Sequence, residues 1–128
     1  MSIRADRRMV YVAGAYSSDN VLHVLDNMRL GIACSAKLLQ VGFSPFCPWA
    51  DHVFYFVAPA NSIPLESIYQ YSLDYCLACA SVFVVDNPRN SGSGGLKKEL
   101  EAAYCSGKPV FWENANGFTT LQNWATAA

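Results

Sequence analysis

The chain has 128 residues, a net charge of -1 and 52% hydrophobic residues. This length suits a substantial core, so we expect a single domain over residues 1–128. Near-neutral charge without a basic run disfavours binding to a nucleic-acid polymer. No apolar stretch is long enough to span a membrane and no signal-peptide pattern is present, so we expect a soluble, cytoplasmic protein with no membrane partner.

Strand and helix patterns alternate in the first third of the chain. Residues 9–13 (MVYVA) form a short apolar run typical of a buried strand. Apolar residues then recur at helical spacing from residue 21 to about residue 40, and Gly42 ends this helix. Residues 43–47 predict a second strand. The candidate caps at the helix N-terminus are Ser17, Ser18 and Asp19.

The loop between the first strand and its helix, residues 14–18 (GAYSS), consists mostly of small residues. It leads into a helix N-terminus, which is a geometry that favours anions. The loop is not a dinucleotide-binding fingerprint, because the pattern G-x-G-x-x-G is absent, and the Walker pattern is absent too.

Residues 49–63 have no clear period and are rich in aromatic side chains. They also carry Asp51 and His52. An aromatic loop over a cleft can stack on a planar ligand such as a nucleobase. A loop packed against its own domain or against a partner subunit explains the composition equally well.

Residues 62–80 predict the next helix. Ser62 and Pro64 follow the usual order of a cap and then a first-turn proline, and apolar residues recur at helical spacing behind them. Asp74 borders the apolar side near the helix end. From the spacing alone we interpret Asp74 as a surface carboxylate.

The segment 82–110 is one strand, loop, helix and strand unit. Residues 82–85 (VFVV) are typical of a strand buried on both faces of a parallel sheet. A loop with three glycines, a helix and a further short strand follow, at residues 86–95, 96–106 and 109–112. Open α/β sheets bind ligands at the carboxyl ends of their strands, where this glycine loop lies.

Glu99 interrupts the apolar stripe of the helix in this unit, between Leu96 and Ala103. A carboxylate turned toward a core or a cleft is costly unless it has a partner or a function, and desolvation would raise its pKa. A glutamate at the edge of the stripe that reaches solvent explains the spacing equally well.

A short closing helix is predicted over residues 118–125. The order of elements predicts an α/β protein, a Rossmann/flavodoxin-like three-layer sandwich with a parallel sheet of about four to five strands. With the first strand central, the loops after residues 13 and 85 lie beside each other. The residues expected to face one another across this crevice are Tyr16, Ser17, Ser93, Gly95 and Glu99.

The five cysteines are spread over apolar segments, and their odd number argues against a disulfide framework. Cys76 and Cys79 form a C-x-x-C pair without a second pair or a nearby histidine, so we interpret them as buried small hydrophobic residues. The Asp, Glu, His and Cys residues show no metal-ligand spacing, so we expect neither a metal nor another cofactor.

Three segments carry a resemblance to a known family: VYVAGAYS at 10–17, the helical Asp74, and SGGLKKELEAAYCSGKPV at 93–110. They resemble the nucleoside 2-deoxyribosyltransferase superfamily, and most closely its nucleoside 5′-monophosphate N-glycosidase branch. The family signature at the nucleophile is S-x-G-x-x-x-E, followed eight residues later by G-K-P-[VI]. This chain matches it with Ser93, Gly95, Glu99 and the GKPV at 107–110. The family opening YxAGxY is matched by Tyr11, Gly14 and Tyr16.

The resemblance implies an enzyme that cleaves the bond between a nucleobase and C1′ of (deoxy)ribose through a covalent intermediate on a glutamate. Glu99 would be the nucleophile, and Asp74 would protonate or orient the departing base. Tyr11 or Tyr16 would hold Glu99 or the sugar. The implied substrate-binding residues are Gly14, Tyr16, Ser17, Ser93, Gly94 and Gly95, of which the last three would bind a 5′-phosphate if the substrate carries one.

The resemblance also bears on partners. Its phosphate-binding branch often has an arginine in the first loop, where this chain has AYSS at 15–18, and Arg89 or Lys97 are the candidates to replace it. Related proteins form dimers or larger assemblies, so the resemblance implies a homo-oligomer whose ligand is a small nucleoside or nucleotide.

Three hypotheses therefore stand on the sequence. The first is an N-glycosidase or deoxyribosyltransferase, favoured by the position of Glu99 after a glycine loop. The second is a non-catalytic nucleotide-binding or sensor module with the same cleft. The third is an assembly protein whose aromatic segment is an interface.

Overall fold

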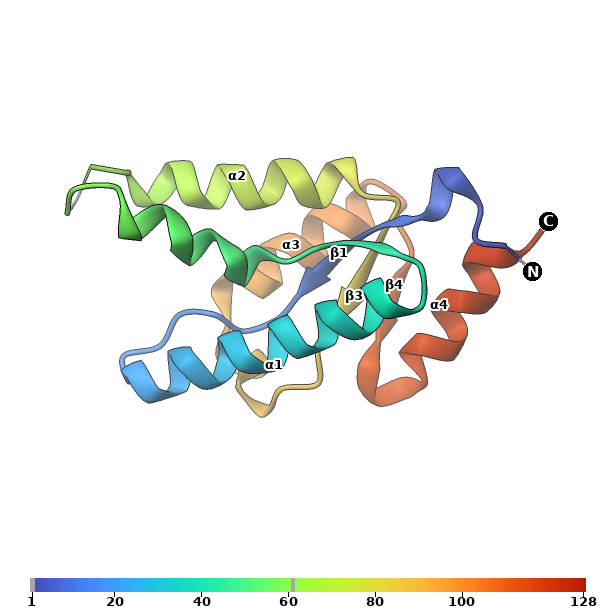
Figure 1. Ribbon diagram of the computed structural model, residues 1–128, viewed down its shortest axis with the longest axis horizontal. Helices are drawn as coiled ribbons and strands as arrows, with labels where there is room; N and C mark the ends of the chain where they lie inside the picture. Colours follow the sequence, from blue (N-terminus) through green and yellow to red (C-terminus); the bar gives the residue numbers. More distant parts are fainter. Residues whose placement is uncertain (1, 61) are drawn as a thin grey trace.

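The computed structural model describes residues 2–60 and 62–128, and within them four parallel strands form one sheet (Figure 1). The strands are β1 (Met9–Ala13), β2 (Ser44–Phe46), β3 (Ser81–Val84) and β4 (Val110–Trp112), in the order β2-β1-β3-β4. The central position of the first strand and the parallel pairing agree with the sequence prediction.

Four α-helices cover the sheet in the described part of the chain: α1 (Val21–Gln40), α2 (Leu65–Ala78), α3 (Gly94–Cys105) and α4 (Gly117–Thr126). Residues of α1 and α4 pack in one hydrophobic cluster and residues of α2 and α3 in another. Figure 1 shows α1 and α2 on opposite sides of the sheet. The protein is thus the predicted Rossmann/flavodoxin-like three-layer sandwich.

Strand β1 is buried on both faces, and its side chains alternate between the two clusters. Val10 and Val12 belong to the cluster with α1 and α4. Tyr11 and Ala13 belong to the cluster with α2 and α3. This alternation places the only polar side-chain group of the strand, the Tyr11 hydroxyl, on the side of the sheet that carries Glu99 of α3.

The start of α1 differs from the sequence prediction. Its cap is Asn20, whose side-chain oxygen accepts a hydrogen bond from the Leu22 amide at 2.9 Å. None of Ser17, Ser18 and Asp19 caps the helix. The Ser18 hydroxyl instead accepts from the Asn20 amide at 3.2 Å, two residues earlier in the chain, and so shapes the approach to the helix.

The predicted Ser62 cap of α2 is also wrong. Pro64 is extended and occupies the cap position itself, which leaves Ser62 two residues outside the helix. By contrast, α3 begins with a side-chain cap, because the Ser93 hydroxyl accepts from the Leu96 amide at 3.1 Å.

The aromatic segment begins as a 3-10 helix, Pro48–Phe56, which has no 3.6-residue period to detect. Trp49 is 1% exposed and packs against α1, where Gly31 leaves room for its ring. The indole N–H donates to the Ala15 carbonyl at 3.1 Å. This tryptophan therefore packs against its own domain, which ties the segment to the loop after β1.

Cys76 and Cys79 are free and fully buried in the cluster beneath α2 and α3, as predicted for small hydrophobic residues.

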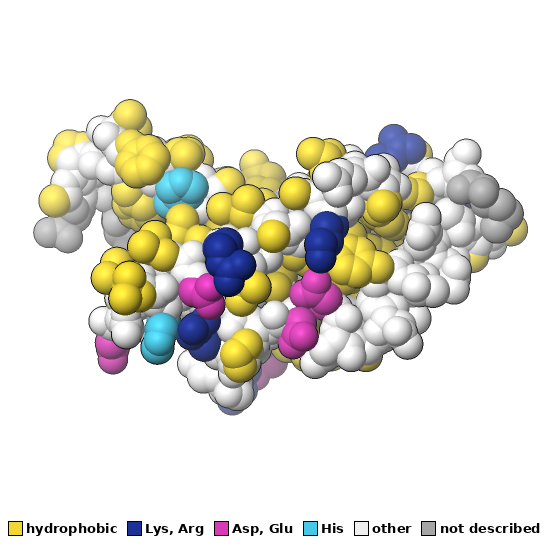
Figure 2. All heavy atoms as spheres, turned by 60° about the horizontal axis from the view of Figure 1, so that its bottom comes forward, with side chains coloured by type: hydrophobic (Ala, Val, Ile, Leu, Met, Phe, Trp, Pro, Cys, Tyr) yellow, Lys and Arg dark blue, Asp and Glu magenta, His cyan; other side chains and the backbone are white. Residues whose placement is uncertain are grey.

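Figure 2 shows the side of the molecule that carries α1, where hydrophobic and charged side chains mix on the surface. The exposed hydrophobic residues of α1 are Val21, Leu22, Leu25, Ile32 and Leu39. Across residues 2–60 and 62–128, the structure has no helix with the length and apolar character needed to cross a membrane.

We predict that Gly31→Ala destabilises the fold. A Cβ at Gly31 would lie 2.3 Å from atoms of the Trp49 ring, which is itself only 1% exposed. Overpacking of this kind lowers the free energy of unfolding by about 1–3 kcal/mol, and the better helix propensity of alanine offsets it only in part. Chemical denaturation measures the change.

The matched control is Gly95→Ala in α3, where an added Cβ meets nothing within 4 Å. This variant should be as stable as the wild type or slightly more stable. Equal stability of the Gly31→Ala protein and the wild type would contradict the packing described here.

Candidate functional site

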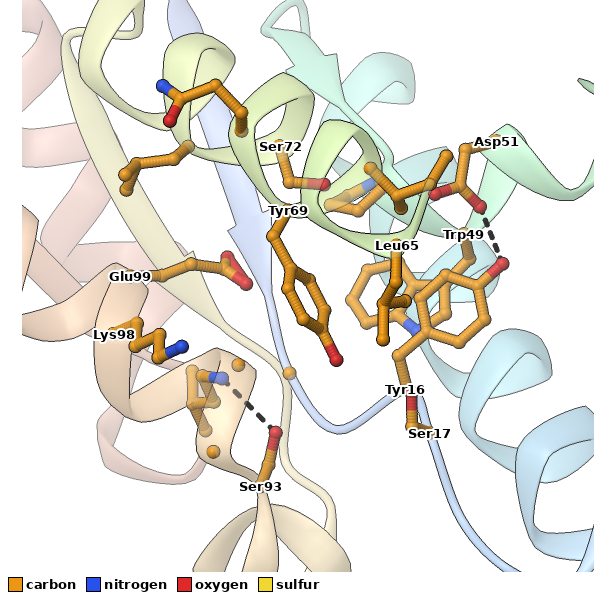
Figure 3. Close-up of a pocket in the computed structure, with 18 of the residues that line it drawn as sticks. Tyr16, Ser17, Trp49, Asp51, Leu65, Tyr69, Ser72, Ser93, Lys98 and Glu99 are labelled. Atoms are coloured by element: carbon orange, nitrogen blue, oxygen red, sulfur yellow. Dashed lines mark hydrogen bonds between the residues drawn. The ribbon is translucent and has the colours of Figure 1, made fainter. Parts of the chain in front are cut away.

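A cavity of about 610 Å³ opens beyond the carboxyl ends of β1, β2 and β3 (Figure 3). Its walls come from the loop after β1, the 3-10 segment after β2, the loop after β3, and helices α2 and α3. The topology accounts for this location, because the carboxyl ends of parallel strands and the loops after them meet at one edge of the sheet.

Seven of the residues singled out in the sequence line this cavity: Gly14, Tyr16, Ser17, Ser93, Gly94, Gly95 and Glu99. The loop after β1 supplies the first three, and the loop after β3 with the start of α3 supplies the others. Two further singled-out residues, Tyr11 and Asp74, do not line it, for different reasons given below.

Glu99 extends from α3 into the cavity (Figure 3). Its Oε2 atom is buried and has no hydrogen-bond partner among the described residues. Burial raises the pKa of this carboxyl to about 7, against a smaller lowering by the Tyr11 hydroxyl. Of the two interpretations left open by the sequence, the structure supports the glutamate that faces a cleft.

Tyr11 lies beneath the cavity floor in β1 and is fully buried. Its ring stacks on Phe46, with the centroids 5.6 Å apart and the planes at 14°. Burial, and next the charge of Glu99, raise the pKa of the phenol, so Tyr11 stays neutral and can donate. The hydroxyl is close enough to influence the Glu99 carboxyl but forms no well-aligned hydrogen bond in the described residues, so both groups retain unused bonding capacity.

The structure does not bring Asp74 to the cavity. Its side chain is exposed and accepts a hydrogen bond from the Gln70 side-chain amide at 2.7 Å. The residues of α2 that line the cavity are Leu65, Glu66, Ile68, Tyr69, Gln70, Ser72 and Leu73. Asp74 is not among them: it lies one residue beyond Leu73, about 100° further around the helix, and its exposed carboxyl is bonded to Gln70. On the turn where the resemblance places an acid, the cavity has Ser72.

Asp51 is a cavity residue that sequence reasoning did not select. It is 5% exposed, and its Oδ1 accepts a hydrogen bond from the Tyr16 hydroxyl at 2.6 Å. Burial raises the pKa of the carboxyl, while the bond from Tyr16 and the nearby His52 lower it. The residue lies in a segment without helix or strand period, so no pattern predicted which way its side chain points.

Aromatic rings form much of the cavity wall. Tyr16 and Trp49 lie with their centroids 6.4 Å apart and their planes tilted by 30°. Tyr55 and Tyr69 also line the cavity while remaining about half exposed. The aromatic segment therefore divides its roles, because Trp49 packs into the core and Tyr55 faces the cavity.

Neither candidate for the missing loop arginine reaches the main cavity. Arg89 forms an ion pair with Asp26 at 2.8 Å and lines a neighbouring hollow of about 590 Å³, which shares Ser17, Gly92 and Ser93 with the cavity. Lys97 lines neither space. Lys98 lines the cavity instead, with its ammonium 5.6 Å from the centre of the Tyr69 ring.

No protein-family model matches this sequence, and no curated protein matches it either. The chemistry of the site therefore rests on its own residues. They combine a desolvated carboxyl, aromatic walls, and the hydroxyl and backbone amides at the start of α3, an arrangement suited to a small polar molecule with a planar part.

We predict that Glu99→Gln stabilises the protein at high pH. The folded state keeps the Glu99 proton up to about pH 7, whereas an ordinary glutamate loses it near 4.5. The folded state thus binds more protons in this window, and the wild type loses stability as pH rises from 4.5 to 7. Glutamine has no such loss, so the variant should be more stable by about 3 kcal/mol at pH 8 and nearly equal below pH 4.5.

Thermal or chemical unfolding of both proteins across this pH range measures the difference. Glu101→Gln is the matched control, because Glu101 lies on the exposed side of the same helix. A pH-independent difference between Glu99→Gln and the wild type would contradict a desolvated Glu99 carboxyl.

Proposed function

We propose that this chain is an N-glycosidase or deoxyribosyltransferase that cleaves the N-glycosidic bond of a (deoxy)nucleoside or its 5′-monophosphate. The observation that carries the proposal is the buried Glu99 carboxyl, which faces a cavity and has an oxygen without a partner. An unpaired buried carboxyl is costly to a fold, and nucleophilic catalysis is a function that explains its retention.

The reaction proceeds in two displacements. The ionised Glu99 oxygen attacks C1′ of the sugar and forms a C–O bond, while the C1′–N bond breaks and its electron pair leaves with the base. The departing base takes up a proton from solvent water in the cavity, and the water or second base that attacks next returns one to solvent. Water, or the nitrogen of a second base, then attacks C1′ and releases Glu99 as a carboxylate. The neutral Tyr11 hydroxyl can donate to the carboxylate when Glu99 is free.

The other walls suit the remaining parts of such a substrate. Tyr16, Tyr55 and Tyr69 provide faces for a base. A 5′-phosphate would find the Ser93 hydroxyl and the Gly94 and Gly95 amides at the N-terminus of α3. Lys98 supplies a positive charge beside this end of the cavity.

One observation favours the second candidate, a non-catalytic nucleotide-binding module. Asp74 is exposed, and Ser72 occupies the cavity side of α2. A serine hydroxyl is a poor acid, and the carboxyl that α2 does bring to the cavity, Glu66 in its first turn, is exposed to solvent, so α2 supplies no buried acid for the departing base. Under this alternative, the cavity binds a nucleotide and the Glu99 carboxyl serves recognition only.

We also propose a cytoplasmic homo-oligomer. The free cysteines suit a reducing compartment. Phe56, Val57 and the cavity-lining Leu65 are large hydrophobic residues exposed to solvent, and subunit interfaces are rich in such aromatic and aliphatic residues.

The first activity test incubates the protein with a panel of deoxynucleosides and their 5′-monophosphates. Chromatography then measures the free base that is released. The wild type should release base from at least one compound, and Glu99→Gln, which keeps the shape but not the nucleophile, should release none. The Glu101→Gln control should retain full activity, because that side chain is exposed away from the cavity. Absence of base release by the wild type, even with a second base as acceptor, would leave the binding module as the better account.

The pH dependence offers a second test once a substrate is found. Only the ionised Glu99 attacks, so kcat/KM should increase with pH and level off above a midpoint near 7. Initial rates at low substrate concentration between pH 5 and 9 measure this profile. A rising limb with a midpoint near 4.5 would show a reacting carboxyl with an ordinary pKa and would count against Glu99.

A further inference from the structure

Asp51 is a buried carboxyl of the cavity that the chemistry proposed above does not use; the other carboxyls that line the cavity are Glu99 and the exposed Glu66. In Figure 3 Asp51 lies on the opposite side of the cavity from Glu99, with Tyr69 between them. Glu99 extends from α3, whereas Asp51 comes from the 3-10 segment after β2. The two carboxyls therefore address different parts of a bound ligand.

The Asp51 carboxylate is short of hydrogen-bond donors. Its two oxygens can accept about four hydrogen bonds, but Tyr16 supplies the only one found in residues 2–60 and 62–128. Over the same residues, no lysine or arginine forms an ion pair with it. A carboxylate that is 5% exposed and lines a cavity has bonding capacity left for donors of a ligand, and such donors would offset its desolvation.

The surrounding residues hold this carboxylate in one orientation. Tyr16 fixes Oδ1 through its 2.6 Å hydrogen bond. The Tyr16 ring packs against Trp49, which is buried and is held by its own hydrogen bond to the Ala15 carbonyl. A carboxylate fixed in this way can accept two parallel hydrogen bonds from a planar group without first losing rotational freedom.

We propose that Asp51 is the base-recognition residue and that it selects a base whose edge carries two adjacent N–H donors, as guanine does with N1–H and its 2-amino group. The inference rests on the proposed function, because it takes the ligand to be a nucleoside or nucleotide with its sugar toward Glu99. Adenine, cytosine and uracil place an acceptor next to a donor on the same edge, and hypoxanthine has a C–H in place of the 2-amino group. The first three would leave one Asp51 oxygen facing a lone pair and hypoxanthine would leave it without a donor, which costs at least about tenfold in affinity.

The test measures binding without turnover, in the Glu99→Gln background. The probes are 2′-deoxyguanosine, 2′-deoxyinosine and 2′-deoxyxanthosine, each also as the 5′-monophosphate. Calorimetry measures the dissociation constant of each probe. Deoxyguanosine should bind at least about tenfold tighter than deoxyinosine, which lacks the 2-amino group. Equal or weaker binding of the guanine compounds would overturn the proposal.

Asp51→Asn provides a reversal that a merely structural aspartate would not show. It replaces one acceptor oxygen by an NH₂ donor, which matches xanthine with its N1–H donor and O2 acceptor. The variant should therefore prefer deoxyxanthosine over deoxyguanosine. If Asp51 only held Tyr16 in place, the substitution would weaken every probe alike and leave the order unchanged, which would also overturn the proposal.

Tyr16→Phe is the matched control, because it removes the 2.6 Å hydrogen bond and keeps the carboxylate. All probes should bind more weakly to it, with the guanine preference retained. Thermal unfolding checks that each variant is folded, and if Asp51→Asn is not, the order of the probes in the Glu99→Gln protein decides alone.

The outcomes separate this inference from the proposed function. A guanine preference without base release by the wild type would overturn the enzyme and keep the recognition residue. Base release without a guanine preference would keep the enzyme and overturn Asp51 as the recognition residue.

Discussion

The site depends first on the pairing of β1 with β3. Their parallel register runs from Val10 opposite Ser81 to Ala13 opposite Val84, so both strands end at the same level. Asn90 extends this alignment into the loops, because its side chain accepts from the Ala15 amide at 2.9 Å and donates to the Val85 carbonyl at 2.7 Å. The loop that carries Tyr16 and the loop that leads to Glu99 are thereby held together before any ligand binds.

The same constraint explains why polar groups end up buried without partners. A strand covered on both faces alternates its side chains strictly, so Tyr11 must enter the layer that holds α3. Its hydroxyl and the Glu99 carboxyl meet there in a poorly solvated space, and neither is fully hydrogen-bonded within the described chain. Groups arranged in this way lower the stability of a fold and are available to a ligand, a combination typical of functional sites.

The sequence predicts the scaffold well because strong periods and turn residues encode it. The order of elements, the central first strand and the inward stripe of α3 that carries Glu99 all follow from apolar spacing and glycine positions. The same spacing could not show whether Glu99 faces a cleft or solvent, because a residue at the edge of an apolar helical stripe can face either. That choice depends on the shape of the cavity between α2 and α3.

The sequence does not predict which of two neighbouring helical residues faces the cavity. Asp74 and Leu73 are neighbours in sequence, yet only Leu73 faces the cavity, and the same holds for Lys97 and Lys98. Asp51 was not predicted as a cavity residue for a different reason. Its 3-10 segment has no α-helical period, and its partner Tyr16, from the loop after β1, reaches it only in the folded chain.

The central claim is that the Glu99 carboxyl is desolvated and faces the cavity. The most direct measurement is the pH titration of its side-chain carboxyl carbon by ¹³C NMR, with the resonance assigned by its absence from the Glu99→Gln protein. The account predicts a midpoint of about 7. A midpoint near 4.5, the ordinary value for a solvated glutamate, would contradict it.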